Sequence, residues 1–129
     1  MPLLASETIW EDQAAACMAR IVDAGQTAYQ IGQIDGVVYG VYRLPGGASV
    51  SNGALASSDV FVNTPSTSYG WTVDGTGWNF RHVFSSTHFP DADQRYRIEV
   101  WATPTTDQPA PRGAIPAHFE VYTKPVFMS

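Results

Sequence analysis

The sequence predicts an all-β fold, a single Greek-key sandwich of roughly seven or eight short strands. Large apolar and polar residues alternate with period two along residues 78–84 and again along residues 96–102, which is the pattern of strands that bury one face. The link between these strands contains the turn signal Phe89-Pro90-Asp91 and is too long for a tight hairpin. We therefore expect the chain to cross between two sheets at this corner.

Length and composition fit one such domain. With 129 residues the chain can bury a core without metal ions or disulfides, and its single cysteine, Cys17, excludes an intrachain disulfide. Charged residues make up only 15% of the chain, and the many Gly, Pro, Ser and Thr are typical of β domains with frequent turns. We expect one domain over residues 1–129, in which residues 1–7 and 124–129 could serve as docking arms.

The first third of the chain contains one clear strand and two ambiguous segments. Residues 6–10 fit a short edge strand or an arm, and residues 14–22 are rich in alanine, which favours a helix. A strand is nevertheless preferred there, because the rest of the chain has the β pattern. The apolar residues of this segment also recur at strand spacing, at Ala15, Cys17, Ala19 and Ile21. Residues 36–44 are apolar on both faces, as expected of a central strand or an interface.

The middle of the chain is predicted to alternate between strands and turns. Residues 49–58 are small and polar and fit a loop or a weak edge strand, while residues 58–63 fit a strand. Another strand is expected at residues 69–73, where apolar side chains alternate, followed by a turn at residues 74–77. Large residues on these regular faces are expected in the core, namely Trp71, Trp78, Phe80 and Phe84.

The last part of the chain is predicted to contain a loop and a closing strand. Residues 104–116 are rich in Pro and Thr and fit an exposed loop. Residues 117–123 alternate again, so that Phe119 and Val121 face the core while Tyr122 faces outward.

No combination of residues points to catalysis or to a bound metal. The sequence contains no nucleophile elbow and no phosphate-binding glycine loop before a helix. Cys17 lies in an apolar segment, where a thiol is usually buried and inert. His118 and Glu120 share one strand face, a spacing that can present two metal ligands but is also the ordinary polar pattern of a solvent face. We expect a protein that is not an enzyme and has no cofactor and no metal site.

Charge and hydropathy narrow the choice of partners. The formal net charge is -5 at pH 7 and no basic patch is present, so we expect no binding to nucleic acid. No segment has the apolar length of a membrane span, and residues 1–7 lack the basic start and the apolar run of an export signal. We therefore expect a protein that matures in the cytosol and does not enter a membrane.

Several apolar side chains are candidates for contact with a partner. Trp101 falls on the outer face of its strand, where it could meet a partner or a sugar, or pack beneath the loop at residues 104–116. Apolar residues near the chain ends could dock on the domain's own edge strand or on a neighbouring subunit. The candidate interface residues are Leu3, Leu4, Trp101, Tyr122 and Phe127.

The segment from Trp71 to His82, with Phe89-Pro90 and the run Tyr96-Arg97-Ile98-Glu99, resembles strands E and F of immunoglobulin-like sandwiches. Asp91 and Asp93 flank the position of the turn aspartate in the tyrosine corner of that family, and neither has its spacing. Ile98 stands where the strand-F cysteine would be. Taken with residues 15–42, the segment is also similar to short immunoglobulin-like sandwich proteins of tailed bacteriophage virions.

This resemblance implies a virion structural protein, most concretely a capsid decoration protein or another head or tail component. Such a protein would be made in the host cytoplasm, reside in the virion and act through interfaces with other virion subunits or with copies of itself. The alternative is a carbohydrate-binding or adhesion module, extracellular or on a cell surface, that uses outward aromatics such as Trp101 and Tyr122.

Overall fold

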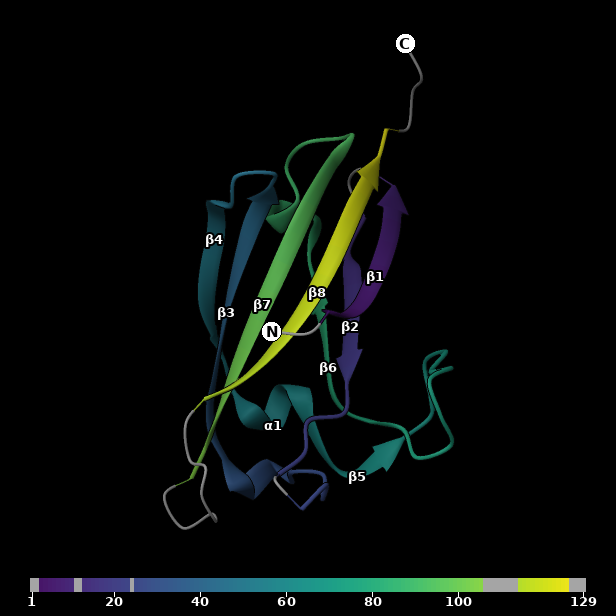
Figure 1. The fold of residues 1–129 in the computed structure, drawn as a ribbon, viewed down its shortest axis with the longest axis vertical. Helices are drawn as coiled ribbons and strands as arrows, with labels where there is room; N and C mark the ends of the chain where they lie inside the picture. The colour runs from purple at the N-terminus through teal and green to yellow at the C-terminus, as the bar shows by residue number, and fades with distance from the viewer. Residues whose placement is uncertain (1–2, 11–12, 24, 106–113, 126–129) are drawn as a thin grey trace.

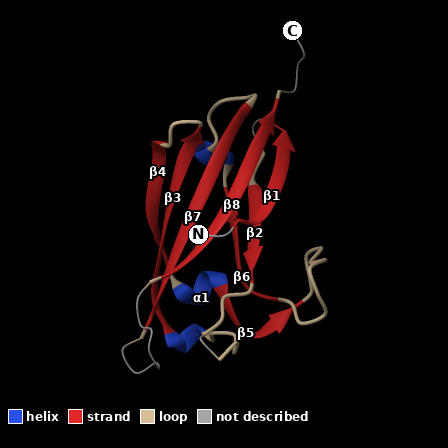
Figure 2. Ribbon diagram, viewed as in Figure 1, coloured by secondary structure: helices blue, strands red, loops and turns tan. Residues whose placement is uncertain are grey.

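The computed structural model describes residues 3–10, 13–23, 25–105 and 114–125, with the backbone alone for residues 3–7, and it is a sandwich of two sheets (Figures 1 and 2). The five-stranded sheet has the order β1 (Leu3–Trp10), β8 (Ile115–Lys124), β7 (Gln94–Pro104), β3 (Ile34–Leu44) and β4 (Ala48–Leu55). The three-stranded sheet has the order β2 (Ala15–Ala19), β6 (Trp78–Phe84) and β5 (Phe61–Ser66). Short helical turns lie between strands: η1 (Ile31–Gln33), α1 (Ser57–Val60) and η2 (Ser86–His88). The prediction of an all-β sandwich is confirmed.

The connectivity is that of an immunoglobulin-like Greek key. The first strand, β1, runs parallel to β8, whereas the other neighbouring strands of both sheets are antiparallel. The chain passes from β6 in the smaller sheet to β7 in the larger one, which is the crossover predicted at the Phe89-Pro90-Asp91 corner. The strands of that fold are lettered in chain order, so that β2 and β3 are B and C, and β5 to β8 are D to G. With these letters the smaller sheet has the order B-E-D and the larger sheet contains the order G-F-C, as the immunoglobulin fold does.

The corner between β6 and β7 is fixed by a buried tyrosine. The hydroxyl of Tyr96 accepts a hydrogen bond from the Asp91 N–H at 2.9 Å and donates to the Asp91 carbonyl at 3.3 Å. The Thr123 hydroxyl, from β8, donates to the same carbonyl at 2.7 Å. The bonds are therefore those of a tyrosine corner. The spacing of Asp91 and Asp93 did not indicate it, because the bonds that form the corner go to the Asp91 backbone and do not depend on where an aspartate side chain stands.

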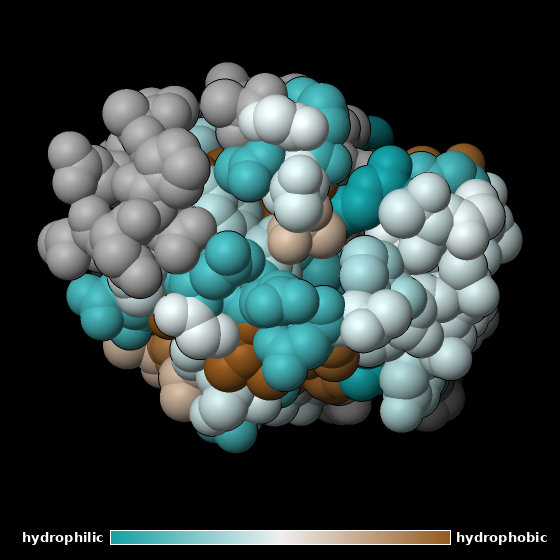
Figure 3. Space-filling model, turned by 90° about the horizontal axis from the view of Figure 1, so that it is seen from below, coloured by the Kyte–Doolittle hydropathy of each residue, from teal (hydrophilic) through white to brown (hydrophobic). Residues whose placement is uncertain are grey.

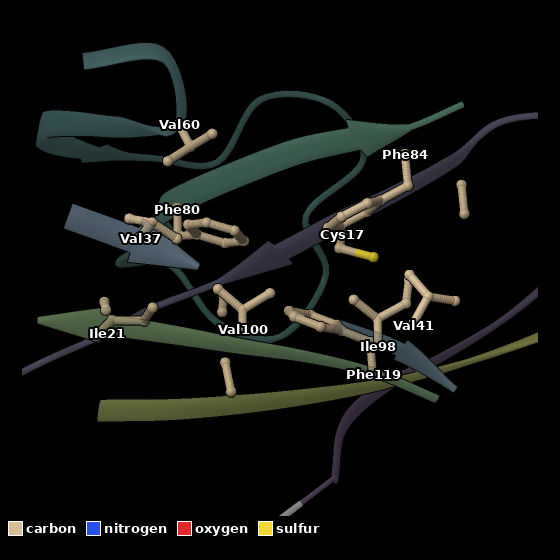
Figure 4. Close-up of a cluster of buried hydrophobic side chains, with 14 of the residues drawn as sticks. Cys17, Ile21, Val37, Val41, Val60, Phe80, Phe84, Ile98, Val100 and Phe119 are labelled. Atoms are coloured by element: carbon tan, nitrogen blue, oxygen red, sulfur yellow. The ribbon is translucent and has the colours of Figure 1, made fainter. Parts of the chain in front are cut away.

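The core lies between the sheets and is built from the faces that the alternation predicts (Figure 4). The rings of Phe80 and Phe119 come from opposite sheets and stack with centroids 6.5 Å apart, and Phe61 meets the edge of Phe80 at 5.6 Å. Cys17, from β2, and Ile98, from β7, both point into this core. The strand prediction for the alanine-rich segment is confirmed, since alternate residues of β2 are buried.

Two of the predictions for the middle of the chain are wrong. Residues 69–73 form turns and bends instead of a strand, with Tyr69 67% and Val73 71% exposed, and Trp71 lies outside the core. The carboxylate of Asp74 holds the end of this loop, since it binds the Trp71 indole N–H, the turn at Thr76 and Gly77, and the Arg20 guanidinium. Residues 57–60, at the start of the strand predicted at 58–63, form the helical turn α1.

The remaining strand predictions hold with shifted boundaries. The polar segment at 49–58 is largely the edge strand β4, so the weak-edge alternative is correct. The strand at 36–44 is the central strand β3, and the edge strand predicted at 6–10 starts earlier, at Leu3. Of the predicted loop at 104–116, residues 106–113 lie outside the described part of the chain.

Substitutions on the two faces of the strands should differ sharply in cost. Phe80 and Ile98 are fully buried, so Phe80→Ala or Ile98→Ala should lower the free energy of unfolding by about 2–5 kcal/mol. Arg97 lies on the outer face of β7, and Arg97→Ala should cost less than about 1 kcal/mol. Urea denaturation of the three variants measures these values, and the opposite ranking would contradict the assignment of the faces.

Two histidines form a half-buried cluster at one edge of the core. The ring of His82 meets the edge of Phe84 at 4.6 Å, and His88 contacts both Tyr39 and Phe84 at ring distances of 5.4 and 5.8 Å. The Nδ1 atom of His88 is 2.8 Å from the Ser51 hydroxyl oxygen. Burial lowers the pKa of both histidines, and the proximity of His88 lowers the pKa of His82 further.

This cluster makes stability depend on pH. Because the folded-state pKa values lie below the ordinary value of 6.5, the unfolded chain binds more protons as the pH falls below 6.5. The stability contributed by the neutral histidines is therefore present above pH 6.5 and is lost as the pH falls through their folded-state pKa values. We expect the unfolding free energy to decrease between pH 7 and about pH 5, and to decrease less in the His82→Gln/His88→Gln double variant. An equal decrease in both proteins, measured by urea denaturation at each pH, would contradict this origin.

Candidate functional site

The outer face of the five-stranded sheet carries two of the residues that the sequence marks as interface candidates. Trp101 is half-buried and lies between Val38 on β3 and Pro116 on β8 in the strand register. Val38 is 50% exposed, so these three residues form an apolar row across three strands, which we call the Trp101 row. An apolar row on an outward sheet face is a feature of surfaces that meet other proteins.

The rest of this face is mainly polar, and several of its side chains are paired. Arg97 forms an ion pair with Glu99, with Nε and Oε2 2.9 Å apart, and its guanidinium lies 5.6 Å from the centre of the Tyr42 ring. The hydroxyl of Tyr122 donates a hydrogen bond to Asp93, and this bond to the neighbouring carboxylate raises the pKa of the tyrosine.

The two outward aromatics that the alternative function needs are far apart. Trp101 on β7 pairs with Pro116, whereas Tyr122 pairs with Arg95, six residues further along β7. At about 3.3 Å per residue this places them roughly 20 Å apart along the sheet. The sheet therefore brings them to one face without joining them into one aromatic platform.

The remaining sequence candidates lie near the two ends of the chain. Leu3 and Leu4 belong to β1, but their side chains are outside the described part of the structure, and so is Phe127. The side chain of Trp10, at the end of β1, is 50% exposed and lies 5.2 Å from the Lys124 ammonium. The sequence pattern does not mark Trp10 as exposed, because Trp10 is the last residue of its strand and no alternation of apolar and polar residues continues beyond it.

A groove of about 820 Å³ lies on the other side of the molecule, against the outer face of β2. We call it the Trp71 groove. One wall is formed by Val22 and by residues 26–30, and the other is β5 with the segment 65–76, which projects from the side of the sandwich in Figure 1. Figure 3 views the end that carries α1 and β5, where the described surface is mainly hydrophilic or neutral. The side chains used in the argument below are Arg20, Gln26, Thr27, Asn63, Trp71 and Thr72.

Asp74 holds the projecting wall of the Trp71 groove in place. Its carboxylate oxygens bind the guanidinium of Arg20 at 2.6 and 2.8 Å. One of the oxygens also accepts bonds from the N–H groups of Thr76 and Gly77 at 3.0 and 3.1 Å, and from the indole nitrogen of Trp71 at 3.2 Å. The bond from Arg20, with the backbone bonds from Gly77 and Thr76, keeps the pKa of Asp74 far below its ordinary range.

Asn79 holds the opposite wall. It is fully buried on β6, where its Oδ1 accepts a bond from the Ile21 N–H at 2.7 Å. Its Nδ2 donates to the carbonyls of Ile21 and Tyr29 at 2.8 and 2.9 Å. These three bonds close the small hairpin between Ile21 and Tyr29, where the Tyr29 N–H also bonds the Ile21 carbonyl at 3.1 Å. The hairpin thus has a fixed position over the sheet.

The Trp71 groove leaves no signal in the sequence, because its residues come from three separate segments. The turn at 74–77 was recognised from its glycines, but the bond from Asp74 to Arg20 spans 54 residues and leaves no local signal. Asn79 sits in an alternating strand at a position expected to face solvent, and only the hairpin that covers it makes it buried.

No protein-family model and no curated protein matches the chain. Within the described residues, no helix has the length and apolar character needed to cross a bilayer. In the same residues, no three His, Cys, Asp or Glu side chains gather as a metal site would require, and His118 and Glu120 stand on the outer face of β8.

Gly77 should be the least replaceable residue of the groove wall. Its φ is +104°, and a Cβ atom there would lie 2.3 Å from the Ser66 carbonyl oxygen. Gly77→Ala should therefore lower the unfolding free energy by about 2 kcal/mol or more. Gly75→Ala is the matched control in the same turn, because a Cβ at Gly75 meets open space, and it should change stability by less than about 0.5 kcal/mol. Equal melting temperatures for the two variants would contradict the described packing of the loop.

Proposed function

We propose that this protein is a non-enzymatic structural subunit of a virion of the tailed-bacteriophage type, most concretely a capsid decoration protein or another head or tail component. It acts through protein–protein interfaces with other virion subunits or with further copies of itself. The proposal includes kinship with the immunoglobulin-like sandwich proteins of such virions, which the segments around Trp78 and Tyr96 resemble.

The observation that carries the proposal is the Trp101 row. It places a tryptophan between two further apolar side chains, Val38 and Pro116, on a broad sheet whose other outward residues are mainly polar. Aromatic residues near the centre of a contact supply much of the binding energy of protein interfaces, and the contacts that surround them shield them from water. A stable contact of this kind needs roughly 800 Å² from each partner.

The charge of the chain supports an outer position in such a particle. The formal net charge of -5 would be repelled by packaged DNA, whereas it is compatible with a protein that binds the outside of a shell. The sandwich also has its own well-packed core, so it can fold before it docks on a partner.

A matched pair of valines tests this assignment. Val38 is 50% exposed in the Trp101 row, and Val83 is 42% exposed on the outer face of the other sheet. Val38→Asp should reduce incorporation into particles at least tenfold, because it places a charge in the contact, whereas Val83→Asp should incorporate like the wild type. The measurement is the amount of each variant in purified virions, quantified by mass spectrometry.

Two results would contradict the proposal. The first is that purified virions of the phage or prophage that encodes the chain do not contain it. The second is that Val38→Asp and Val83→Asp incorporate equally well, which would remove the Trp101 row from the interface even if the chain is a virion component.

The alternative function is carbohydrate binding, for which Trp101 and Tyr122 would act as separate contacts, since they lie roughly 20 Å apart along the sheet. It is favoured by a different observation, the Trp71 groove.

A further inference from the structure

We propose that the Trp71 groove is a binding site for an uncharged saccharide, a short stretch of a glycan chain. This inference goes beyond the structural role proposed above and does not depend on it, because the groove and the Trp101 row lie on the outer faces of different sheets.

The size of the groove suits an oligosaccharide. Its volume of about 820 Å³ lies in the upper part of the range of about 300–1,000 Å³ that is usual for small-molecule sites. It lies against the outer face of β2 between two walls and is partly open to solvent, so a short chain of sugar rings can lie in it.

The charges of the groove favour a neutral ligand. Among the described lining residues, Arg20 is the only one with a charged side chain, and the Asp74 carboxylate binds it at 2.6 Å. A phosphate or carboxylate ligand would have to compete with Asp74 for the guanidinium, and it would then approach an acidic group. Nucleotides, phosphopeptides and acidic sugars are therefore disfavoured relative to neutral sugars.

The polar groups of the groove match the chemistry of sugar hydroxyls. They are amides and hydroxyls, from Gln26, Thr27, Asn63 and Thr72, which both donate and accept hydrogen bonds as each sugar hydroxyl does. The Oδ1 of Asn63 accepts a bond from the Ile31 N–H at 2.9 Å, which fixes the side chain. Within the described residues its Nδ2 donates to no other group, so it can donate to a ligand.

Trp71 supplies the aromatic surface. Its indole N–H donates to Asp74 at 3.2 Å, so the ring is anchored at one edge and remains half-exposed in the groove wall. The apolar C–H face of a sugar ring packs on such an aromatic surface, and an anchored ring loses little freedom when the ligand binds. The same anchor explains why an apolar tryptophan stands in a polar loop outside the core.

Hydrogen bonds and an ion pair hold both walls of the groove in fixed positions without a ligand. Asp74 fixes one wall to Arg20, which directly follows β2, and Asn79 fixes the other wall through three bonds to Ile21 and Tyr29. A site with both walls held in this way binds without first ordering its loops, which improves affinity at a given contact area.

The test begins with a glycan array probed with the full chain. We expect binding to one or more neutral oligosaccharides, and titration calorimetry of such a hit should show at least tenfold weaker binding by Trp71→Ala. Trp71→Phe keeps an aromatic ring and should stay within about threefold of the wild type, since stacking and not the N–H bond contacts the ligand. Trp10→Ala, which removes an exposed tryptophan from the other sheet, should bind like the wild type.

Circular dichroism melting of each variant separates loss of the site from loss of the fold. The proposal is overturned if no neutral glycan on the array binds, or if a folded Trp71→Ala variant binds its glycan as well as the wild type. It is also overturned if the groove instead binds an extended peptide, shown by a peptide-array hit whose affinity falls in Trp71→Ala while glycans have no effect. None of these outcomes bears on whether the chain is a virion component, which mass spectrometry of purified virions decides.

Discussion

The contact between Phe80 and Phe119 is the constraint on which the sandwich depends. These rings come from the middle strand of the smaller sheet and from a strand of the larger sheet, and each is almost fully buried. Because strand side chains alternate, fixing this one contact decides which face of β6 and of β8 points inward. The outward residues follow from the same choice, including Val83 on one sheet and Tyr122 on the other.

Asn79 shows how the same alternation also places a polar residue in a fully buried position. It is next to Phe80, so it must point away from the core, yet the hairpin between Ile21 and Tyr29 covers it completely. A buried amide is tolerated because its oxygen and its nitrogen are both hydrogen-bonded to backbone. Asn79 thus fixes the hairpin on the outer face of the sheet, and residues of that hairpin form one wall of the Trp71 groove.

The strands could be predicted from the sequence because burial on one face imposes a two-residue period, which is visible in β2, β6 and β7. The loop at residues 69–73 has the same period and was mistaken for a strand. The difference is made by Asp74, whose carboxylate satisfies backbone N–H groups and binds Arg20. Such long-range bonds cannot be read from a local pattern. The same limit applies to the candidate interface. The alternation along β7 predicts that Trp101 points outward, but it does not predict that Val38 and Pro116 lie beside it, because that follows from the register between strands.

The edge strand β4 contains neither a charged residue nor a proline, so its unpaired backbone is open to association with another sheet. One irregularity counters this. The register against β3 shifts where Val41 pairs with Ser51 and Tyr42 pairs with Ser49, so Val50 has no partner. A bulge of this kind increases local twist, and a twisted margin is a poor template for a flat incoming strand. The bulge at Val50 therefore makes β4 less suited to pairing edge to edge with a second sheet than an unbroken strand would be.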